Sequence, residues 1–287
     1  MPGSRTIETS PVRSGPPVTQ PVIFQCGVAK SGNFWLYTAI QKLLDAAGVE
    51  QRSFIQNQPI YQQAKDWTLS FPEQASIDVL DITPQAYVTR ISSRFEQEIT
   101  DLDAYLAEAT HVWSHSPYRA GLSDAVFKRV NCVIYIVRDP RDALLSMADF
   151  VFTPYMRQHF PTAHDDRDAY LAERIGIFPK QWAGHVKGYL EADPALGVHI
   201  LTYEEMKRDL RGALVGLAGW MGLADIPRDE FDRLATSLSF EAMRGSRPGH
   251  INRGKAERWR TELTPEMNAR IIEAAGPTMT QMGYALD

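Results

Sequence analysis

Residues 27–33 form a short loop whose residue types suit the binding of an anion. Gly27, Ser31 and Gly32 make a tight turn after an apolar stretch, and a helical pattern begins directly behind it. Backbone N–H groups converge where a strand turns into a helix, and the helix dipole adds positive potential there. Lys30 supplies a mobile full charge and Ser31 a hydroxyl group. The segment predicts a phosphate-type loop, although a Gly/Ser turn with a solvated lysine explains it equally well when it is taken alone.

The loop departs from the nucleotide-triphosphatase motif GxxxxGK[ST]. Ala29 stands before the lysine where that motif requires glycine, and the spacing from Gly27 to Lys30 is too short. A P-loop kinase for a nucleoside or another small molecule would also need acidic magnesium ligands at a strand end. It therefore stays as the alternative function rather than the first one.

Strands that alternate with helices are the elements that must position this loop. Residues 22–28 indicate a buried strand, and residues 34–47 a helix that Gly48 ends. The other predicted elements are strands at 110–114, 132–137 and 198–203, and helices at 143–150, at 210–222 and after the N-cap Thr264. This order predicts an α/β fold, a single three-layer domain with a central, mostly parallel sheet flanked by helices. We expect the domain to cover residues 21–287, behind a disordered, proline-rich tail at residues 1–20.

Composition excludes several classes of protein. Thirty Lys and Arg against 35 Asp and Glu give a net charge of −5, which argues against a general nucleic-acid binder. Two cysteines, Cys26 and Cys132, rule out a disulfide framework and predict buried thiols in a reducing compartment. The sequence has no apolar run long enough for a membrane span and no signal-peptide pattern, so we expect a cytoplasmic protein. The histidines and cysteines show no metal-ligand spacing, and we expect no metal.

Five segments, in order, resemble the signatures of the sulfotransferases that use 3′-phosphoadenosine 5′-phosphosulfate. Residues 30–36 (KSGNFWL) are similar to the end of PKSGTTWL, and residues 132–146 (CVIYIVRDPRDALLS) to a strand that ends in Arg, with Ser eight residues later. The other matches are residues 201–207 (LTYEEMK, against LxYEDMK), 239–243 (SFEAM, against SFxxM) and 253–264 (against RKGxxGDWxxxFT). Each is weak alone, but five in register are specific. The resemblance implies a P-loop sulfotransferase-like fold and a sulfotransferase enzyme with that donor as its cofactor.

The resemblance assigns the first loop to the 5′-phosphosulfate. Lys30 matches the catalytic lysine that contacts the bridging oxygen and stabilises the leaving phosphate. Ser31, Gly32, Asn33 and the amide of Phe34 match the cradle, with Phe34 where the family usually has Thr. Trp35 matches the ring that stacks on adenine, with core packing as the alternative.

Other segments are implied to hold the rest of the nucleotide. Arg138 and Ser146 match the pair on the 3′-phosphate, where an Arg fork can bind bidentately. We expect Asp139 and Arg141 to pair with each other or with neighbours, outside the site. The remaining nucleotide contacts implied are Tyr203, Phe240 and Met243 near adenine and Asn252, Arg253 and Gly254 over the 3′-phosphate. Core packing is the alternative for the adenine neighbours, and a one-residue shift decides between Asn252 and Arg253.

A histidine is implied as the general base. His115, in the segment Trp113-Ser114-His115-Ser116-Pro117, matches the family's histidine in a KTHLP-like segment. Trp113 stands at the family's lysine, so that charge is absent. A histidine within reach of an acceptor hydroxyl is suited to remove its proton. His111 is the rival, at the expected start of a strand.

The sequence indicates the chemical class of the acceptor but not its identity. Residues 54–71 and 150–182 are irregular and rich in aromatic side chains, which indicates either core under long loops or the wall of an apolar pocket. The second interpretation predicts a small-molecule acceptor, an apolar or aromatic alcohol, with an amine also open. A non-catalytic nucleotide-binding member of the fold is the other alternative. The family's dimer segment is poorly kept at residues 260–269, and the oligomeric state stays open.

The charge of the chain is unevenly distributed. Residues 244–260 carry six basic residues against one acid, Glu257. We expect Lys30 and Arg138 to join this basic segment around one cleft, because a local field can attract a small anion to an acidic protein.

Overall fold

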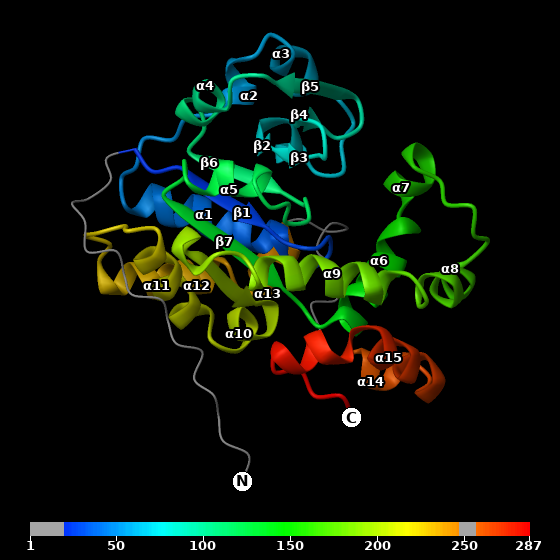
Figure 1. Cartoon of the computed structure of the whole chain (residues 1–287). Helices are drawn as coiled ribbons and strands as arrows, with labels where there is room; N and C mark the ends of the chain where they lie inside the picture. The colour runs from blue at the N-terminus through cyan, green and yellow to red at the C-terminus, as the bar shows by residue number, and fades with distance from the viewer. Residues whose placement is uncertain (1–19, 247–256) are drawn as a thin grey trace.

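The computed structural model of the chain describes residues 20–246 and 257–287 and is built around a parallel sheet of five strands (Figure 1). The strand order is β2-β6-β1-β7-β8, and every neighbouring pair runs parallel. The strands are β1 (Ile23–Cys26), β2 (Asp78–Val79), β6 (His111–Ser114), β7 (Cys132–Val137) and β8 (Val198–Thr202). The sequence placed four of these strands to within two residues at each end. The fold class is confirmed.

Both faces of the sheet are covered, because side chains along its central strands alternate between two apolar cores. On β7, Val133, Tyr135 and Val137 belong to one core, whereas Ile134 and Ile136 belong to the other. The first core is closed by α6 (Pro140–Val151), α9 (Phe178–Leu190) and α15 (Pro265–Gln281). The second is closed by α1 (Asn33–Ala46), α11 (Leu210–Trp220) and α12 (Arg228–Ser237). This burial on both faces explains why β7 is apolar throughout.

Short helices fill the connections between these layers. They are α2 (Phe54–Asn57), α3 (Tyr61–Ala64), α4 (Leu102–Ala107), α5 (Leu122–Phe127), α7 (Pro154–His159), α8 (Arg167–Arg174), α10 (Tyr203–Arg208), α13 (Phe240–Ser246) and α14 (Trp259–Glu262), with 3₁₀ turns at Pro72–Ser76 and Pro194–Leu196. Asp139 caps α6 by accepting from Arg141 N, with Pro140 at its first position. Thr264 caps α15 in the same way, as its sequence predicted.

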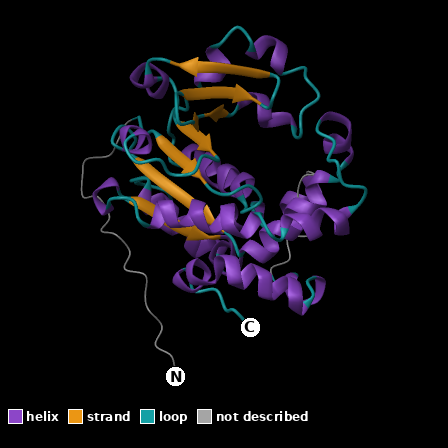
Figure 2. Cartoon of the chain, turned by 45° about the vertical axis from the view of Figure 1, so that its right-hand side comes forward, coloured by secondary structure: helices purple, strands orange, loops and turns teal. Residues whose placement is uncertain are grey.

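A second, antiparallel sheet was not predicted. Its order is β3-β4-β5, with β3 (Asp81–Ile82), β4 (Tyr87–Ile91) and β5 (Phe95–Ile99) (Figure 2). Ser92, in the turn between β4 and β5, has a φ of 55°. The side chains of β5 are mostly exposed, since Glu96, Gln97 and Glu98 interrupt the apolar pattern. This polar character hid the strand from a search for buried runs.

Two further expectations can be compared with the described residues. Cys26 and Cys132 are both buried thiols outside any disulfide, as predicted. No helix among residues 20–246 and 257–287 is both long and apolar enough to cross a membrane. The expected tail lies outside the described residues, apart from its last position.

Candidate functional site

A cavity of about 570 Å³ lies where the chain leaves the carboxyl ends of the central strands. Strand β1 has β6 on one side and β7 on the other, so the segments that follow these three strands meet there. Such a point in an open α/β sheet is where ligands bind. The predicted site residues that line the cavity are Lys30, Gly32, Asn33, Phe34, Trp35, His115, Arg138, Ser146, Tyr203, Phe240 and Met243. The residues that the sequence assigned to one site therefore line one cavity in the structure.

The loop between β1 and α1 is pressed against its surroundings. Gly32 is the N-cap of α1 with a φ of 96°, a backbone conformation that glycine adopts without strain. A Cβ atom at Gly32 would lie 2.7 Å from the ring of Tyr203, and one at Gly27 would lie 2.5 Å from the carbonyl oxygen of Ile136. Any larger residue at either position would therefore clash with these neighbouring atoms. The close fit holds the N-terminal amides of α1 at the cavity.

Ser31 and Asn33 complete this loop in different ways. The Asn33 side-chain amide donates to the carbonyl oxygen of Val28 at 2.9 Å, and so ties the loop across its base. The Ser31 hydroxyl is buried and has no hydrogen-bond partner among the described residues. A buried donor without a partner at a helix N-terminus fits an anionic oxygen as its acceptor. Among the predicted site residues that the structure describes, only Ser31 does not line the cavity.

Lys30 carries a mobile charge in an apolar setting. Its backbone is in the left-handed region, with a φ of 72°, and its Nζ lies 3.9 Å from the centre of the Phe150 ring. Burial lowers the pKa of Lys30 to about 8, and the nearby charge of Arg138 acts in the same direction while Asp149 opposes it. The ammonium group is therefore poorly solvated, and an anion in the cavity would stabilise its charged form.

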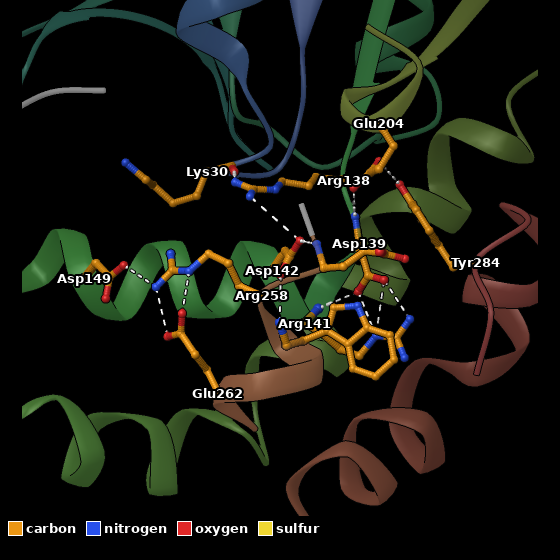
Figure 3. Close-up of polar contacts among 12 residues, drawn as sticks. Lys30, Arg138, Asp139, Arg141, Asp142, Asp149, Glu204, Arg258, Glu262 and Tyr284 are labelled. Carbon is orange, nitrogen blue, oxygen red and sulfur yellow. Dashed lines mark hydrogen bonds and ion pairs between the residues drawn. The ribbon is translucent and has the colours of Figure 1, made fainter. Parts of the chain in front are cut away.

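Arg138 stands at the end of β7, and Figure 3 shows it beside Lys30 and Asp142. Its guanidinium lies 4.3 Å from the centre of the Tyr203 ring, and its Nη1 donates to the Lys30 carbonyl oxygen at 3.3 Å. Its Nη2 is 4.0 Å from the buried Asp142 carboxylate. Ser146, two turns along α6 from this strand end, lines the same cavity. An arginine fork and a hydroxyl so placed can bind a phosphate together.

Asp142 connects this arginine to the C-terminal part of the chain. Its carboxylate accepts from the backbone N–H groups of Glu257, at 2.6 Å, and Trp259, at 3.2 Å. Burial raises the pKa of Asp142, while the charge of Arg138 acts to lower it. The start of α14 is thereby held beside the strand end that carries Arg138.

Asp139 and Arg141 pair with each other rather than enter the cavity lining (Figure 3). Arg141 Nη2 donates to Asp139 at 2.7 Å, and the same nitrogen donates to the carbonyl oxygen of Ala285 at 2.6 Å. The Arg141 guanidinium also lies 3.5 Å from the centre of the Trp259 ring. The two residues brace the turn after β7, as the sequence analysis expected.

His115 and Trp113 lie side by side in the cavity wall. Trp113 belongs to β6, and His115 follows directly after its end. Nδ1 of His115 is 2.6 Å from the Gly27 carbonyl oxygen, and the Trp113 indole N–H donates to His115 Nε2 at 3.2 Å. Burial lowers the pKa of His115 to about 4, with the Gly27 carbonyl acting against it. The ring is therefore neutral at pH 7. The rival, His111, is bonded to Gln25 and Gln41 and does not line this cavity.

Three aromatic rings and a thioether, buried or half-buried, line the cavity beside the cationic loop. Trp35 meets Tyr203 edge to face at 5.6 Å, and its indole N–H donates to the Leu238 carbonyl oxygen at 2.8 Å. Tyr203 and Met243 are both buried and line the cavity, as does Phe240. Met243 and Trp35 thus pack with the second core on one side and line the cavity on the other.

Two walls of the cavity can be distinguished by composition. The cationic wall consists of the loop at residues 29–33 with Arg138, Ser146 and Arg258. The apolar wall consists of Phe71, Ile77, Val79, Met147, Phe150, Tyr155, Met156 and Phe160. Phe34 lies where the walls join, 4.8 Å from Phe71 between ring centres. The aromatic segments are therefore divided: four of their rings line the cavity, whereas Phe54, Phe152 and Trp182, among others, pack against the core.

Sequence reasoning missed the remaining lining residues. Arg90, Ser92, Ser93 and Glu96 come from the β4–β5 hairpin, whose strands contain no buried run that would have signalled them. Arg258 was counted only as part of a basic run; it pairs with Asp149 at 2.8 Å and Glu262 at 2.8 Å (Figure 3). The predicted contacts Asn252, Arg253 and Gly254 lie outside the described residues, as does much of the basic segment at 244–260.

No cluster of three or more His, Cys, Asp or Glu side chains that could hold a metal ion occurs in the part of the chain that the structure describes.

Comparisons with known proteins agree on one family. A family model described as "Sulfotransferase domain" matches residues 20–283. The chain is 31% identical over 148 residues to luciferin sulfotransferase of Photinus pyralis, which covers 48% of this chain and 36% of that protein. It is 26% identical over 282 residues to cytosolic sulfotransferase 17 of Arabidopsis thaliana, covering 85% and 80%. The chain matches less than half the length of luciferin sulfotransferase and of the amine sulfotransferase of Oryctolagus cuniculus (42%).

Solved structures share the fold. Mouse sulfotransferase SULT7A1, complexed with PAP, aligns with a TM-score of 0.58 at 20% identity, over 91% of this chain and 84% of that one. Retinol dehydratase, in a complex with retinol and PAP, aligns with a TM-score of 0.57 at 18% identity, over 92% and 82%. At these identities the likeness establishes the architecture.

Proposed function

Because the chain belongs to the sulfotransferase family, we propose that it moves a sulfuryl group from 3′-phosphoadenosine 5′-phosphosulfate to the hydroxyl group of a small, apolar or aromatic acceptor. The observation that carries this proposal is the shared cavity of Lys30, Arg138 and His115. Two cations for a doubly phosphorylated nucleotide and one neutral imidazole for a proton thus face a single space. We take residues 21–287 to be one sulfotransferase domain.

The cationic wall fits such a nucleotide. The N-terminal amides of α1, Lys30 and the partnerless hydroxyl of Ser31 suit the 5′-phosphosulfate. Arg138 and Ser146 suit the 3′-phosphate, with Asn252, Arg253 and Gly254 as further candidates for that phosphate. The rings of Trp35, Tyr203 and Phe240, together with the Met243 thioether, suit adenine. PAP (3′-phosphoadenosine 5′-phosphate) in the related mouse structure supports the same nucleotide here.

The chain's own residues perform positioning and proton transfer. Bound in the cavity, the donor supplies the sulfuryl group, and its 5′-phosphate leaves with the electron pair of the broken S–O bond. Lys30 and the loop amides lie where charge develops on that leaving phosphate, which is electrostatic catalysis. Nε2 of His115 accepts the proton of the acceptor hydroxyl as the oxygen forms its bond to sulfur. Negative charge in the cavity raises the pKa of His115 above its value in the free protein, which favours this transfer.

The apolar wall supports an apolar acceptor. Its eight side chains are aromatic or aliphatic, or carry the thioether of methionine, and they line the same cavity as the imidazole that would take the proton. The relatives are consistent with this class of acceptor: one solved neighbour holds retinol, and one curated relative is named for luciferin. An amine acceptor stays open, since another relative is an amine sulfotransferase.

Calorimetry with two nucleotides tests the proposal. We expect 3′-phosphoadenosine 5′-phosphate to bind at micromolar concentration or below, and ATP with magnesium to bind far more weakly. Binding of ATP without binding of the bisphosphate would favour a small-molecule kinase instead. A screen of alcohols, phenols and amines with ³⁵S-labelled donor then separates a catalyst from a non-catalytic nucleotide-binding protein, because only the catalyst labels an acceptor.

A further inference from the structure

Both ring nitrogens of His115 are engaged in the described structure. The Gly27 carbonyl oxygen, 2.6 Å from Nδ1, can only accept a hydrogen bond, so Nδ1 must carry the proton. The neutral ring then has its lone pair on Nε2, which is the atom that would take a proton from an acceptor. The Trp113 indole N–H, which can only donate, already points to this lone pair at 3.2 Å.

The indole of Trp113 is supported from behind by a stack of side chains. Its ring centre is 5.5 Å from that of Tyr37, and the Tyr37 ring stacks on His111 at 4.7 Å and 17°. His111 is fixed by hydrogen bonds to Gln41, at 2.9 Å, and Gln25, at 3.1 Å. Trp113 itself is only 9% exposed. The packing of β1, β6 and α1 therefore positions the indole N–H at His115 in the free protein.

We propose that Trp113 is a positioning residue that caps the basic nitrogen of His115, and that the acceptor's hydroxyl must replace the indole N–H before His115 can take its proton. This inference rests on the proposed function, since it concerns the same base. The replacement exchanges one hydrogen bond for another: Nε2 loses the indole donor and gains the acceptor's O–H. An acceptor without a hydrogen to donate cannot make this exchange.

The cap has two measurable consequences. First, the acceptor's binding competes with an internal hydrogen bond, so removal of the indole N–H should strengthen that binding. Second, a donor on Nε2 stabilises the neutral imidazole, so its removal should raise the pKa of His115. The charged and titratable groups that act on His115 from the elements packed around it are Asp81 on β3, Arg90 on β4 and His185 on α9. None of these contacts changes when the Trp113 N–H is removed.

The test is Trp113→Phe, which keeps an aromatic ring and deletes the N–H. The control is Trp220→Phe, because Trp220 also contacts a histidine, in its case by stacking on His199 at 4.8 Å, but lies outside the cavity. In Trp113→Phe we expect the ¹⁵N resonance of His115 Nε2 to move downfield at neutral pH. We also expect the acceptor's KM to fall about three- to tenfold, and the acidic limb of kcat/KM to rise by about half to one pH unit, as the loss of one hydrogen bond implies. Trp220→Phe should match the wild type.

A structural role alone predicts a different result. If Trp113 only fills space, Trp113→Phe lowers stability or kcat, but leaves the Nε2 resonance and the acidic limb in place, and that outcome overturns the cap. Should this variant fail to fold, His115→Ala in the full chain gives the reverse measurement. The indole N–H proton of Trp113 should then move upfield, and an unmoved proton overturns the cap as well. The nuclear resonances decide this point even if no acceptor is turned over, which would instead overturn the proposed function.

Discussion

The two walls of the cavity are built in different ways. The cationic wall rests on backbone geometry at the ends of β1 and β7, where Arg138 is held by a hydrogen bond to the Lys30 carbonyl oxygen and by the buried Asp142 carboxylate. The apolar wall is assembled from residues 71–79 and 147–160, two segments that lie far apart in the sequence. Specific polar contacts therefore fix the position of Arg138 in the first wall, whereas the second wall depends on the volume and shape of its apolar side chains. We expect substitutions in the first to affect the donor and those in the second the acceptor.

His115→Ala should have the largest effect on catalysis of all the variants, and it tests the residue that we propose lies between the donor and the acceptor. Loss of a general base lowers kcat by about 10²- to 10⁴-fold. The affinity for 3′-phosphoadenosine 5′-phosphate should stay within a few-fold, because His115 contacts the Gly27 backbone and Trp113 rather than the cationic side chains. Steady-state rates and calorimetry on the same protein measure both quantities. His164→Ala is the matched control, since His164 pairs with Glu173 away from the cavity. A fully active His115→Ala enzyme would remove this residue from the mechanism.

Lys30→Met should lower kcat by about 10²- to 10³-fold, the usual cost of losing one group that stabilises developing charge. The methionine keeps much of the apolar contact with Phe150 but cannot stabilise the leaving phosphate. Single-turnover measurements at saturating donor isolate this step from binding. A loss of affinity for the unreactive bisphosphate with kcat unchanged would instead assign Lys30 to binding alone.

The same lysine predicts a pH dependence of nucleotide binding. Its pKa is lowered to about 8 in the free protein, so its charge is present below that pH and is lost as the pH rises through it. Affinity for the bisphosphate should therefore fall by several-fold between pH 7 and pH 9, because binding above pH 8 must first take up a proton. Calorimetry in buffers of different ionisation enthalpy detects that proton. Lys30→Met should show a flat profile over this range.

Arg138→Ala tests whether the cationic wall acts on the donor alone. The loss of hydrogen bonds to a charged phosphate should weaken binding of the bisphosphate by about 10- to 100-fold. The acceptor's KM should change little, because Arg138 contacts Tyr203, Lys30 and Asp142 and no residue of the apolar wall in the described contacts. Arg129→Ala is the control, as Arg129 is an exposed arginine paired with Asp103. An equal rise in the acceptor's KM would show that the walls are not independent.

The contrast between the walls also explains what the sequence could predict. The loop at residues 27–33 and the turn at Arg138 could be placed because a strand end and a helix start impose their residue types locally, as Gly32 and Asp139 illustrate. His115 could be named only through its resemblance to a motif, since nothing in residues 113–117 alone separates it from His111. The hairpin residues Arg90 and Glu96 were missed because long-range packing, and no local signal, carries them to the cavity.

The aromatic segment at residues 150–160 shows the same limit at the level of single residues. Phe152 and Phe160 are alike in type and are both half-buried, and composition cannot say which of them faces a ligand. In the structure Phe160 lines the cavity, whereas Phe152 packs against the core and meets Tyr170 edge to face at 6.3 Å. The direction in which α7 leaves α6 makes this difference.

The smallest expected effect uses this pair to sharpen the comparison. Phe160→Ala should raise the KM of an apolar acceptor by about three- to tenfold, since it removes part of the apolar surface that the acceptor covers, and should leave nucleotide affinity unchanged. Phe152→Ala should do the opposite: it should lower the free energy of unfolding by about 1–3 kcal/mol through lost packing and leave the acceptor's KM near its wild-type value. Urea denaturation gives the free energy of unfolding of each variant, and steady-state kinetics gives its KM for the acceptor. If Phe160→Ala weakened binding of the nucleotide as much as that of the acceptor, the apolar wall would belong to the donor's site, and the division of the cavity would have to be redrawn.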